Sequence, residues 1–237
     1  MSKKKLEPFL STNEITKISF DCGLDKILSG GIESKTITQF YGPPASGKTN
    51  LCLLAVVRCV GQGKKAVFID TEGGHSIERL SQIAGDNLEA VLGNSYFYEP
   101  ASFADQQFIV ENLDQIITPE VGLIVLDSAV AFYRFERNDE NASEINKRLT
   151  SQLSLLSGYA RKHNLAIIIT TQVYASFDVE NSFEPVGGLI LKYWSKVIVE
   201  LKRDGRDVEA VLIRHRTLPD GMNCRFQITS EGIKTFD

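Results

Sequence analysis

Two short apolar runs stand out in the middle of the chain. Residues 123–126 and 166–169 contain no polar side chain, which is typical of strands covered on both faces of a sheet. Segments with the spacing of amphipathic helices alternate with these and other strand-like segments. Strands are predicted at 36–41, 65–70, 95–98, 121–127 and 165–171, and helices at 50–60, 76–83, 104–117 and 144–162. Such alternation predicts an α/β fold with a mainly parallel, twisted sheet and helices on both faces.

The pattern changes after Trp194. Residues 196–201, 208–214 and 225–228 alternate between apolar and polar side chains, and Asp204 and Gly205 mark a turn. This pattern predicts antiparallel strands added to one edge of the sheet. Residues 1–10 are predicted to form a flexible tail, and 11–237 a single domain, because no linker long enough to separate two domains follows.

Composition narrows the functional classes. The 237 residues carry a formal net charge of −4, so binding to nucleic acid would need local basic patches. We find no run of about 18 apolar residues and no secretory signal, and therefore predict no contact with a membrane. The four cysteines form no Cys-x-x-Cys pair and are interpreted as reduced and structural. A cytoplasmic, nucleoid-associated protein is expected.

A phosphate-binding loop is predicted between the strand at 36–41 and the helix that follows it. The loop fits the pattern G-x-x-x-x-G-K-[ST] and reads Gly42-Pro43-Pro44-Ala45-Ser46-Gly47-Lys48-Thr49. Its backbone N–H groups and the start of the helix would face the phosphates of a nucleotide. Lys48 is expected to reach the β- and γ-phosphates of ATP, and the Thr49 hydroxyl to bind Mg²⁺. The next residue, Asn50, is included in the expected nucleotide site.

Polar residues follow three of the predicted strands, at the edge where ligands bind in such sheets. Asp127 ends an apolar strand of the Walker B form and is expected to hold Mg²⁺, partly through water. Glu72 could activate a water for attack on the γ-phosphate, and Gln172 could sense that phosphate. The alternatives are an Asp127 that caps a loop, a solvated Glu72 and a Gln172 without a role.

Several motifs together resemble the RecA/RadA recombinase family over residues from about 18 to 237. The residues that carry the resemblance are Gly30-Gly31-Ile32-Glu33, Phe68-Ile69-Asp70-Thr71-Glu72-Gly73, Ile77-Glu78-Arg79-Leu80, Asp127-Ser128-Ala129, Phe132-Tyr133-Arg134, Ile169-Thr170-Thr171-Gln172-Val173 and Leu218-Pro219. The form of the phosphate loop and the short chain are similar to an archaeal branch of this family that lacks the N-terminal helix–hairpin–helix domain. The resemblance implies a RecA-like P-loop NTPase core.

The resemblance also implies roles for individual residues. Glu72 would be the catalytic base, with Lys48 and Gln172 assisting, and Arg79 would stack on adenine. Pro219 would cap the ATP of a neighbouring copy. Residues 130–143 correspond to a first DNA-binding loop and 174–191 to a second. The implied DNA contacts are Arg134 and Arg137 in the first loop, with Gly187 and Gly188 as the hinge of the second. Local positive charge, and not the resemblance, adds Lys192, Lys196, Lys202 and Arg203 on a basic edge as further candidate DNA contacts.

Some features depart from the family pattern. No Phe-x-x-Ala polymerisation motif precedes the core, and residues 175–184 hold three acids and no Lys or Arg, which disfavours contact with phosphate. Residues 192–216, by contrast, carry seven Lys or Arg against four Asp or Glu, a surplus that a solvated sheet edge would also explain. Filament formation and strand exchange are therefore not expected.

Three functions remain open. The first is a weak ATPase that binds single- or double-stranded DNA without sequence preference and assists homologous recombination and repair. The second is a regulatory module that ATP switches without turnover. By family resemblance, its partners would be the main archaeal recombinase RadA and a Holliday junction resolvase. The third is a RecA-fold ATPase with a protein client.

Overall fold

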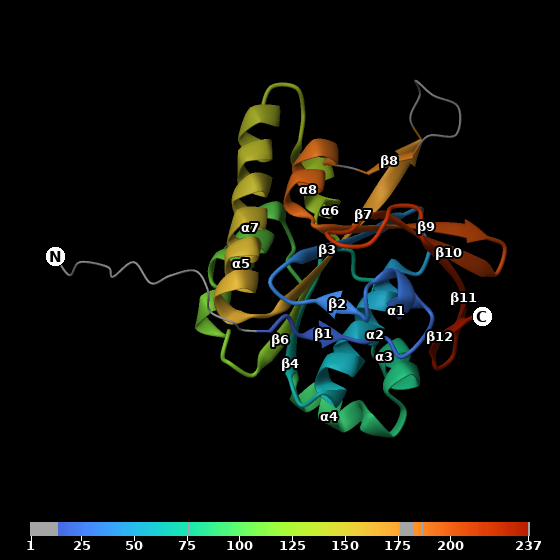
Figure 1. Ribbon diagram of the computed structural model, residues 1–237. Helices are drawn as coiled ribbons and strands as arrows, with labels where there is room; N and C mark the ends of the chain where they lie inside the picture. The colour runs from blue at the N-terminus through green and yellow to red at the C-terminus, as the bar shows by residue number, and fades with distance from the viewer. Residues whose placement is uncertain (1–13, 75, 176–182, 186, 237) are drawn as a thin grey trace.

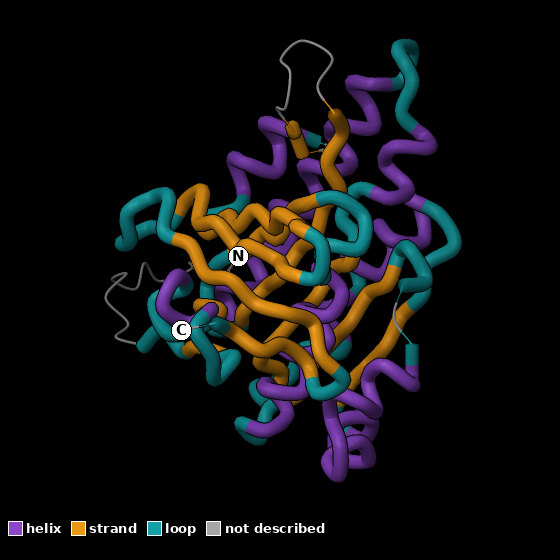
Figure 2. Tube along the Cα trace, turned by 90° about the vertical axis from the view of Figure 1, so that its right-hand side faces the viewer, coloured by secondary structure: helices purple, strands orange, loops and turns teal. Residues whose placement is uncertain are grey.

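A twisted sheet runs through the middle of the molecule, with helices on either side of it (Figures 1 and 2). The computed structural model describes residues 14–74, 76–175, 183–185 and 187–236. The predicted tail at 1–10 lies outside these residues. The strands follow the order β12-β11-β10-β9-β3-β7-β6-β4-β5, and β8 pairs with β7.

The central part of the sheet is parallel, as predicted. It contains β3 (Ile37–Gly42), β4 (Lys65–Asp70), β5 (Ser95–Tyr98), β6 (Val121–Asp127) and β7 (Ala166–Ala175). β9 (Val197–Asp204) also runs parallel to β3, so the prediction of an antiparallel strand at 196–201 was wrong on that side and holds only for its pairing with the next strand. The alternating pattern indicates a strand but not its direction. The apolar runs at 123–126 and 166–169 lie side by side in β6 and β7 and are buried. Because the strands run in one direction, β3, β4, β6 and β7 all end at the same edge of the sheet, which we call the carboxyl edge.

Two apolar clusters, one on each face, hold the helices to the sheet. On one face lie α1 (Leu24–Ile27), α2 (Lys48–Gly61), α3 (Ile77–Ala84) and α4 (Leu88–Gly93). On the other face lie α5 (Phe103–Glu111), α6 (Ala131–Glu136), α7 (Ala142–His163) and α8 (Gly188–Trp194). Each large apolar side chain buried in this way contributes about 1.5–3 kcal/mol to the stability of the fold.

Antiparallel strands extend the sheet beyond β9, also as predicted. They are β10 (Asp207–Arg214), β11 (Asn223–Thr229) and β12 (Gly232–Thr235). Because β10 runs away from the carboxyl edge and β11 returns to it, the turn between β11 and β12 lies close to the start of α2. A Cβ on Gly47 would lie 2.9 Å from the Cδ1 atom of Ile228 in β11.

A small two-stranded sheet lies beside the start of β7, where Ser34 forms a bridge with Ala166. β1 (Lys17–Ile18) pairs antiparallel with β2 (Ile32–Glu33). Gly31 has a φ of +129°, and a Cβ at this position would lie 2.3 Å from the carbonyl oxygen of Ile18. The tight approach of the two segments therefore requires glycine at position 31.

Several elements differ from the sequence predictions. The predicted helix at 104–117 is divided into α5 and a 3₁₀ turn, η2 (Leu113–Gln115), and a second 3₁₀ turn, η1 (Gly85–Asn87), precedes α4. The helices α1, α4, α6 and α8 and the strands β1, β2, β8 (Phe183–Pro185) and β12 were not predicted. The pattern missed them because each spans at most seven residues, too few to show a clear period.

Candidate functional site

The phosphate loop joins β3 to α2 at the carboxyl edge, as predicted. Its two glycines meet specific steric demands: a Cβ on Gly42 would lie 2.4 Å from the carbonyl oxygen of Leu201, and Gly47 has a φ of +92°. Ala45 also lies in the left-handed region, with a φ of +59°. Pro44 and Ala45 are exposed at the tip of the loop, whereas Ser46 is buried.

Lys48 is buried beneath this loop. Its Nζ atom donates hydrogen bonds to the carbonyl oxygens of Gly42 (3.0 Å) and Pro43 (2.9 Å) and lies 3.5 Å from the Ser46 hydroxyl. Burial lowers the pKa of the Lys48 ammonium, and the negative charges of Glu72 and Asp127 oppose this shift. The ammonium therefore lies at the place where the sequence predicts the phosphates of a nucleotide.

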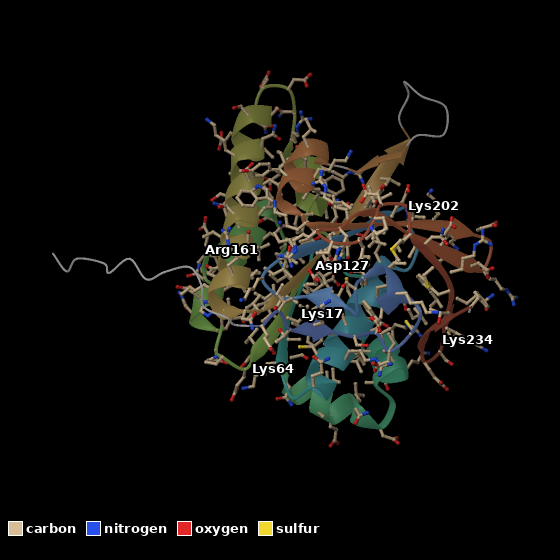
Figure 3. All side chains as sticks on the ribbon, viewed as in Figure 1. Lys17, Lys64, Asp127, Arg161, Lys202 and Lys234 are labelled. Atoms are coloured by element: carbon tan, nitrogen blue, oxygen red, sulfur yellow. The ribbon has the colours of Figure 1, made fainter. Side chains whose placement is uncertain are left out.

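Asp127 lies near the centre of the molecule, whereas Lys202 and Lys234 lie toward the side that carries the antiparallel strands (Figure 3). The hydroxyls of Thr49 and Thr170 both bond to the Asp127 carboxylate. Burial raises the pKa of Asp127 to about 6, although these two hydrogen bonds act in the opposite direction. A carboxylate and a hydroxyl are oxygen ligands of the kind that Mg²⁺ binds together with substrate phosphates, so the two predicted metal residues, Thr49 and Asp127, are adjacent and fit this ion.

Glu72 comes just after β4, and Gln172 lies in β7. Although β6 separates these two strands in the sheet, the two side chains are in contact. The amide nitrogen of Gln172 lies 3.0 Å from each carboxylate oxygen of Glu72. The backbone N–H of Glu72 donates to the Oδ1 atom of Asp70 at 3.0 Å. Both predicted residues thus lie at the carboxyl edge, because Gln172 is the parallel partner of Gly42 in the phosphate loop.

A cleft of about 400 Å³ opens beside this pair. Its lining residues are Thr71, Glu72, Ser128, Val130, Ala131, Arg134, Phe135 and Gln172. The Arg134 guanidinium lies 3.4 Å from the side-chain oxygen of Gln172. The first predicted DNA contact is therefore connected through one side chain to the predicted catalytic carboxylate.

Arg79, which the family resemblance predicts to stack on adenine, forms hydrogen bonds with α2, α3 and the turn between β11 and β12. Its guanidinium donates to the side-chain oxygens of Asn50 (2.5 Å) and Gln82 (2.9 Å). It also donates to the carbonyl oxygens of Ser230 (3.2 Å) and Gly232 (3.3 Å). Asn50 thus contacts Arg79, the residue predicted to stack on adenine. The turn between β11 and β12 contacts the same guanidinium and therefore borders the candidate site. No local pattern in the sequence indicates that this turn belongs to the site.

Pro219 lies far from the phosphate loop of its own chain. It is exposed in the connection between β10 and β11, and β10 ends at the edge opposite the carboxyl edge. Arg216, in the same connection, pairs with Glu33 of β2 at 2.5 Å. Pro219 is therefore not placed to cover the nucleotide of its own chain, and its role over the nucleotide of a neighbour stays a prediction.

The predicted basic edge is divided in the structure. Lys192 lies in α8 and Lys196 just before β9, whereas Lys202 and Arg203 lie at the end of β9, about 20 Å further along the strand. Lys202 pairs with Glu200 at 3.4 Å, and Lys196 donates to the carbonyl oxygen of Tyr193 at 3.1 Å. The four cations do not form one continuous surface, because β9 places them at opposite ends of the sheet.

The other predicted DNA residues fall near the carboxyl edge. Arg134 lies in the last turn of α6 and Arg137 directly follows the helix, and both are exposed. Gly187 and Gly188, with φ values of +76° and +29°, form the start of α8. Residues 176–182 of the predicted second DNA-binding loop lie outside the described part of the chain.

Comparisons with known proteins find relatives that span most of the chain. The model of the Rad51 family matches residues 12–236. The DNA repair and recombination protein RadB of Methanosphaera stadtmanae is 43% identical over 226 residues, 93% of this chain and 97% of that protein. Its counterpart in Methanobrevibacter smithii is 42% identical and covers 92% of this chain and 95% of its own length.

The chain belongs to the RadB branch of the Rad51 family. A crystal structure of the RadB recombinase superposes with a TM-score of 0.80 at 36% identity, covering 93% of this chain and all of that one. The RecA-like fold and the family predicted from the sequence are therefore confirmed. Among the described residues, no helix has the length and apolar character needed to cross a bilayer.

Proposed function

We propose that the chain binds ATP with Mg²⁺ at the phosphate loop, hydrolyses it slowly and binds DNA as an accessory protein of recombination and repair. The observation that carries the proposal is the convergence of Lys48, Glu72 and Asp127 at one edge of the sheet. The Lys48 ammonium donates hydrogen bonds to the loop carbonyls, and the Asp127 carboxylate is hydrogen-bonded to the Thr49 side chain. Mg²⁺ bound by Thr49 and Asp127 would neutralise charge on the phosphates.

The protein residues have distinct tasks in this proposal. Lys48 exchanges its carbonyl partners for phosphate oxygens, to which its positive charge binds more strongly. Glu72 orients a water and accepts its proton, and Gln172 holds the carboxylate in place. Arg79 and the turn between β11 and β12 form the side of the site that would receive the base.

A second function has one observation in its favour. Gln172 donates toward both oxygens of Glu72, which leaves the carboxylate less available to orient a water. A chain held in this state would bind ATP without turning it over and would act as a switch on a partner. The main archaeal recombinase RadA and a Holliday junction resolvase are the partners that family resemblance proposes.

Calorimetric titration of the protein with ATP and MgCl₂ tests the nucleotide site. We expect saturable binding that Lys48→Ala weakens at least 10-fold, because the variant loses a charged contact to the phosphates. Lys162→Ala, which removes an exposed lysine from the last turn of α7, is the matched control and should bind as the unmodified chain does. Equal affinity in the unmodified chain and Lys48→Ala would refute the proposed site.

A further inference from the structure

Arg203 contacts the phosphate loop from outside. Its Nη1 atom donates to the carbonyl oxygen of Ala45 at 2.5 Å, and its Nε atom donates to the carbonyl oxygen of Gly205 at 3.1 Å. β9 runs parallel to β3 in the sheet, and Glu200 pairs with Tyr41. The end of β9 therefore lies level with the loop, and the second hydrogen bond anchors the guanidinium to the β9–β10 turn.

The hydrogen bond from Arg203 reaches the peptide group between Ala45 and Ser46, whose C=O and N–H are both hydrogen-bonded. The N–H of Ser46, which belongs to the same peptide group as the Ala45 carbonyl, donates to the carbonyl oxygen of Pro43 at 3.3 Å. Ala45 itself has a φ of +59°, a left-handed conformation that is unfavourable for alanine. Arg203 thus stabilises the residue of the loop that has the least intrinsic preference for its own backbone conformation.

Two cations share the carbonyl oxygens of the loop. Lys48 binds those of Gly42 and Pro43 from below, and Arg203 binds that of Ala45 from outside. An arriving phosphate group would draw Lys48 away from its carbonyls, because charge-assisted bonds to an anion are stronger. Arg203 would keep its partner, since the Ala45 carbonyl is directed toward the β9–β10 turn and not toward Lys48.

We propose that Arg203 is a positioning residue that holds the phosphate loop in its binding conformation after Lys48 has turned to the nucleotide. This inference rests on the proposed nucleotide function. It assigns Arg203 to the nucleotide site, whereas the sequence placed it among the DNA contacts. The loop binds the phosphates that ATP and ADP share, so Arg203 should support both nucleotides equally.

Hydrogen exchange without nucleotide tests the contact directly. In Arg203→Ala, the amides of residues 45–47 should exchange several-fold faster than in the unmodified chain, because the Ala45–Ser46 peptide loses one of its two anchors. Arg203→Lys retains one donor of the same charge and should restore most of the protection. Arg206→Ala removes the same charge from the β9–β10 turn, where Arg206 is exposed, and serves as the control. Unchanged exchange in Arg203→Ala would overturn the inference.

Titration with ATP and with ADP tests the functional consequence. We expect Arg203→Ala to lose affinity for both nucleotides about 5- to 20-fold, as for the loss of one charged hydrogen bond. Arg203→Lys should lie between Arg203→Ala and the unmodified chain, and Arg206→Ala should match the latter. Normal binding by Arg203→Ala, with a lower salt dependence of DNA binding instead, would overturn the inference alone. Failure of the unmodified chain to bind either nucleotide would remove the proposed function and the role of Arg203 with it.

Discussion

The amide nitrogen of Gln172 lies 3.0 Å from both carboxylate oxygens of Glu72. Gln172 lies near the end of β7 and Glu72 lies two residues after the end of β4, and β6 separates these two strands in the sheet. The contact therefore crosses the carboxyl edge and places a single amide between the predicted base and Arg134. A change in the position of Gln172 would alter both the orientation of Glu72 and its link to the first DNA-binding region.

Replacing the Glu72 carboxylate should separate binding from hydrolysis. Glu72→Gln keeps the size of the side chain but cannot accept a proton, so ATP affinity should persist while hydrolysis falls about 100-fold or more. Glu78→Gln, an exposed substitution in the first turn of α3, is the control. Steady-state release of phosphate measures the effect. If the unmodified chain shows no hydrolysis above the level of Lys48→Ala, the assignment of a catalytic base fails and the switch function gains support.

DNA binding should depend on the two arginines at the end of α6. Reversal of Arg134 and Arg137 to Glu should remove two phosphate contacts, so the slope of log K against log salt on single strands should flatten by about 1.4. Fluorescence anisotropy with labelled oligonucleotides over a range of salt concentrations measures this slope. Reversal of Arg161, which Figure 3 places away from α6 in the last turn of α7, should change it little. Binding that is insensitive to salt would contradict a contact through phosphates.

The close approach of β1 and β2 should make position 31 intolerant of any side chain. Gly31→Ala brings a Cβ to 2.3 Å from the Ile18 carbonyl oxygen at a φ of +129°, and we expect a loss of about 2–4 kcal/mol in the free energy of unfolding. Gly61→Ala, at the end of α2, meets no heavy atom within 4 Å and should be neutral or slightly stabilising. Urea denaturation of both variants compares the two positions.

The buried carboxylate of Glu33 should make stability depend on pH. Burial alone would raise the pKa of Glu33, but the hydrogen bond and charge of Arg216, together with Lys17, lower it below its ordinary value. A carboxylate with a lowered folded-state pKa contributes stability that is complete above its unfolded-state pKa and is lost as the pH falls through the folded-state pKa.

Glu33→Gln should therefore be less stable than the unmodified chain by about 1–3 kcal/mol at pH 7, because Arg216 and Lys17 lose their shared partner. The difference should shrink as the pH falls through the lowered folded-state pKa of Glu33, where the carboxylate becomes protonated. Thermal unfolding at a series of pH values measures it. A difference that stays constant over this range would show that the ion pairs contribute nothing to stability.

The parallel core and the phosphate loop could be predicted because their signals are local. The predicted bounds of β4, β5 and β6 match the structure, since buried strands carry uninterrupted apolar runs between turns. That Asp127, Glu72 and Gln172 lie at one edge followed from the rule that ligands bind where parallel strands end, but the contact between Glu72 and Gln172 was not predicted.

Contacts that depend on the angle of a turn could not be predicted in this way. Arg203 reads as a surface cation in the sequence, because nothing local shows that β9 ends beside Ala45. Arg79 likewise gives no sign that its partners are the carbonyls of Ser230 and Gly232, about 150 residues away. Backbone carbonyls leave no trace in a sequence, and only the assembled sheet brings them to a side chain.

The turn between β11 and β12 also sets the order in which the site can be completed during synthesis. The phosphate loop leaves the ribosome early, yet Ile228, Ser230 and Gly232, which contact Gly47 and Arg79, are translated long afterwards. Until then Arg79 lacks the carbonyl groups of Ser230 and Gly232 that hold its guanidinium in the site. A nascent chain could form its parallel core during translation but would gain a complete nucleotide site only after β12 has emerged.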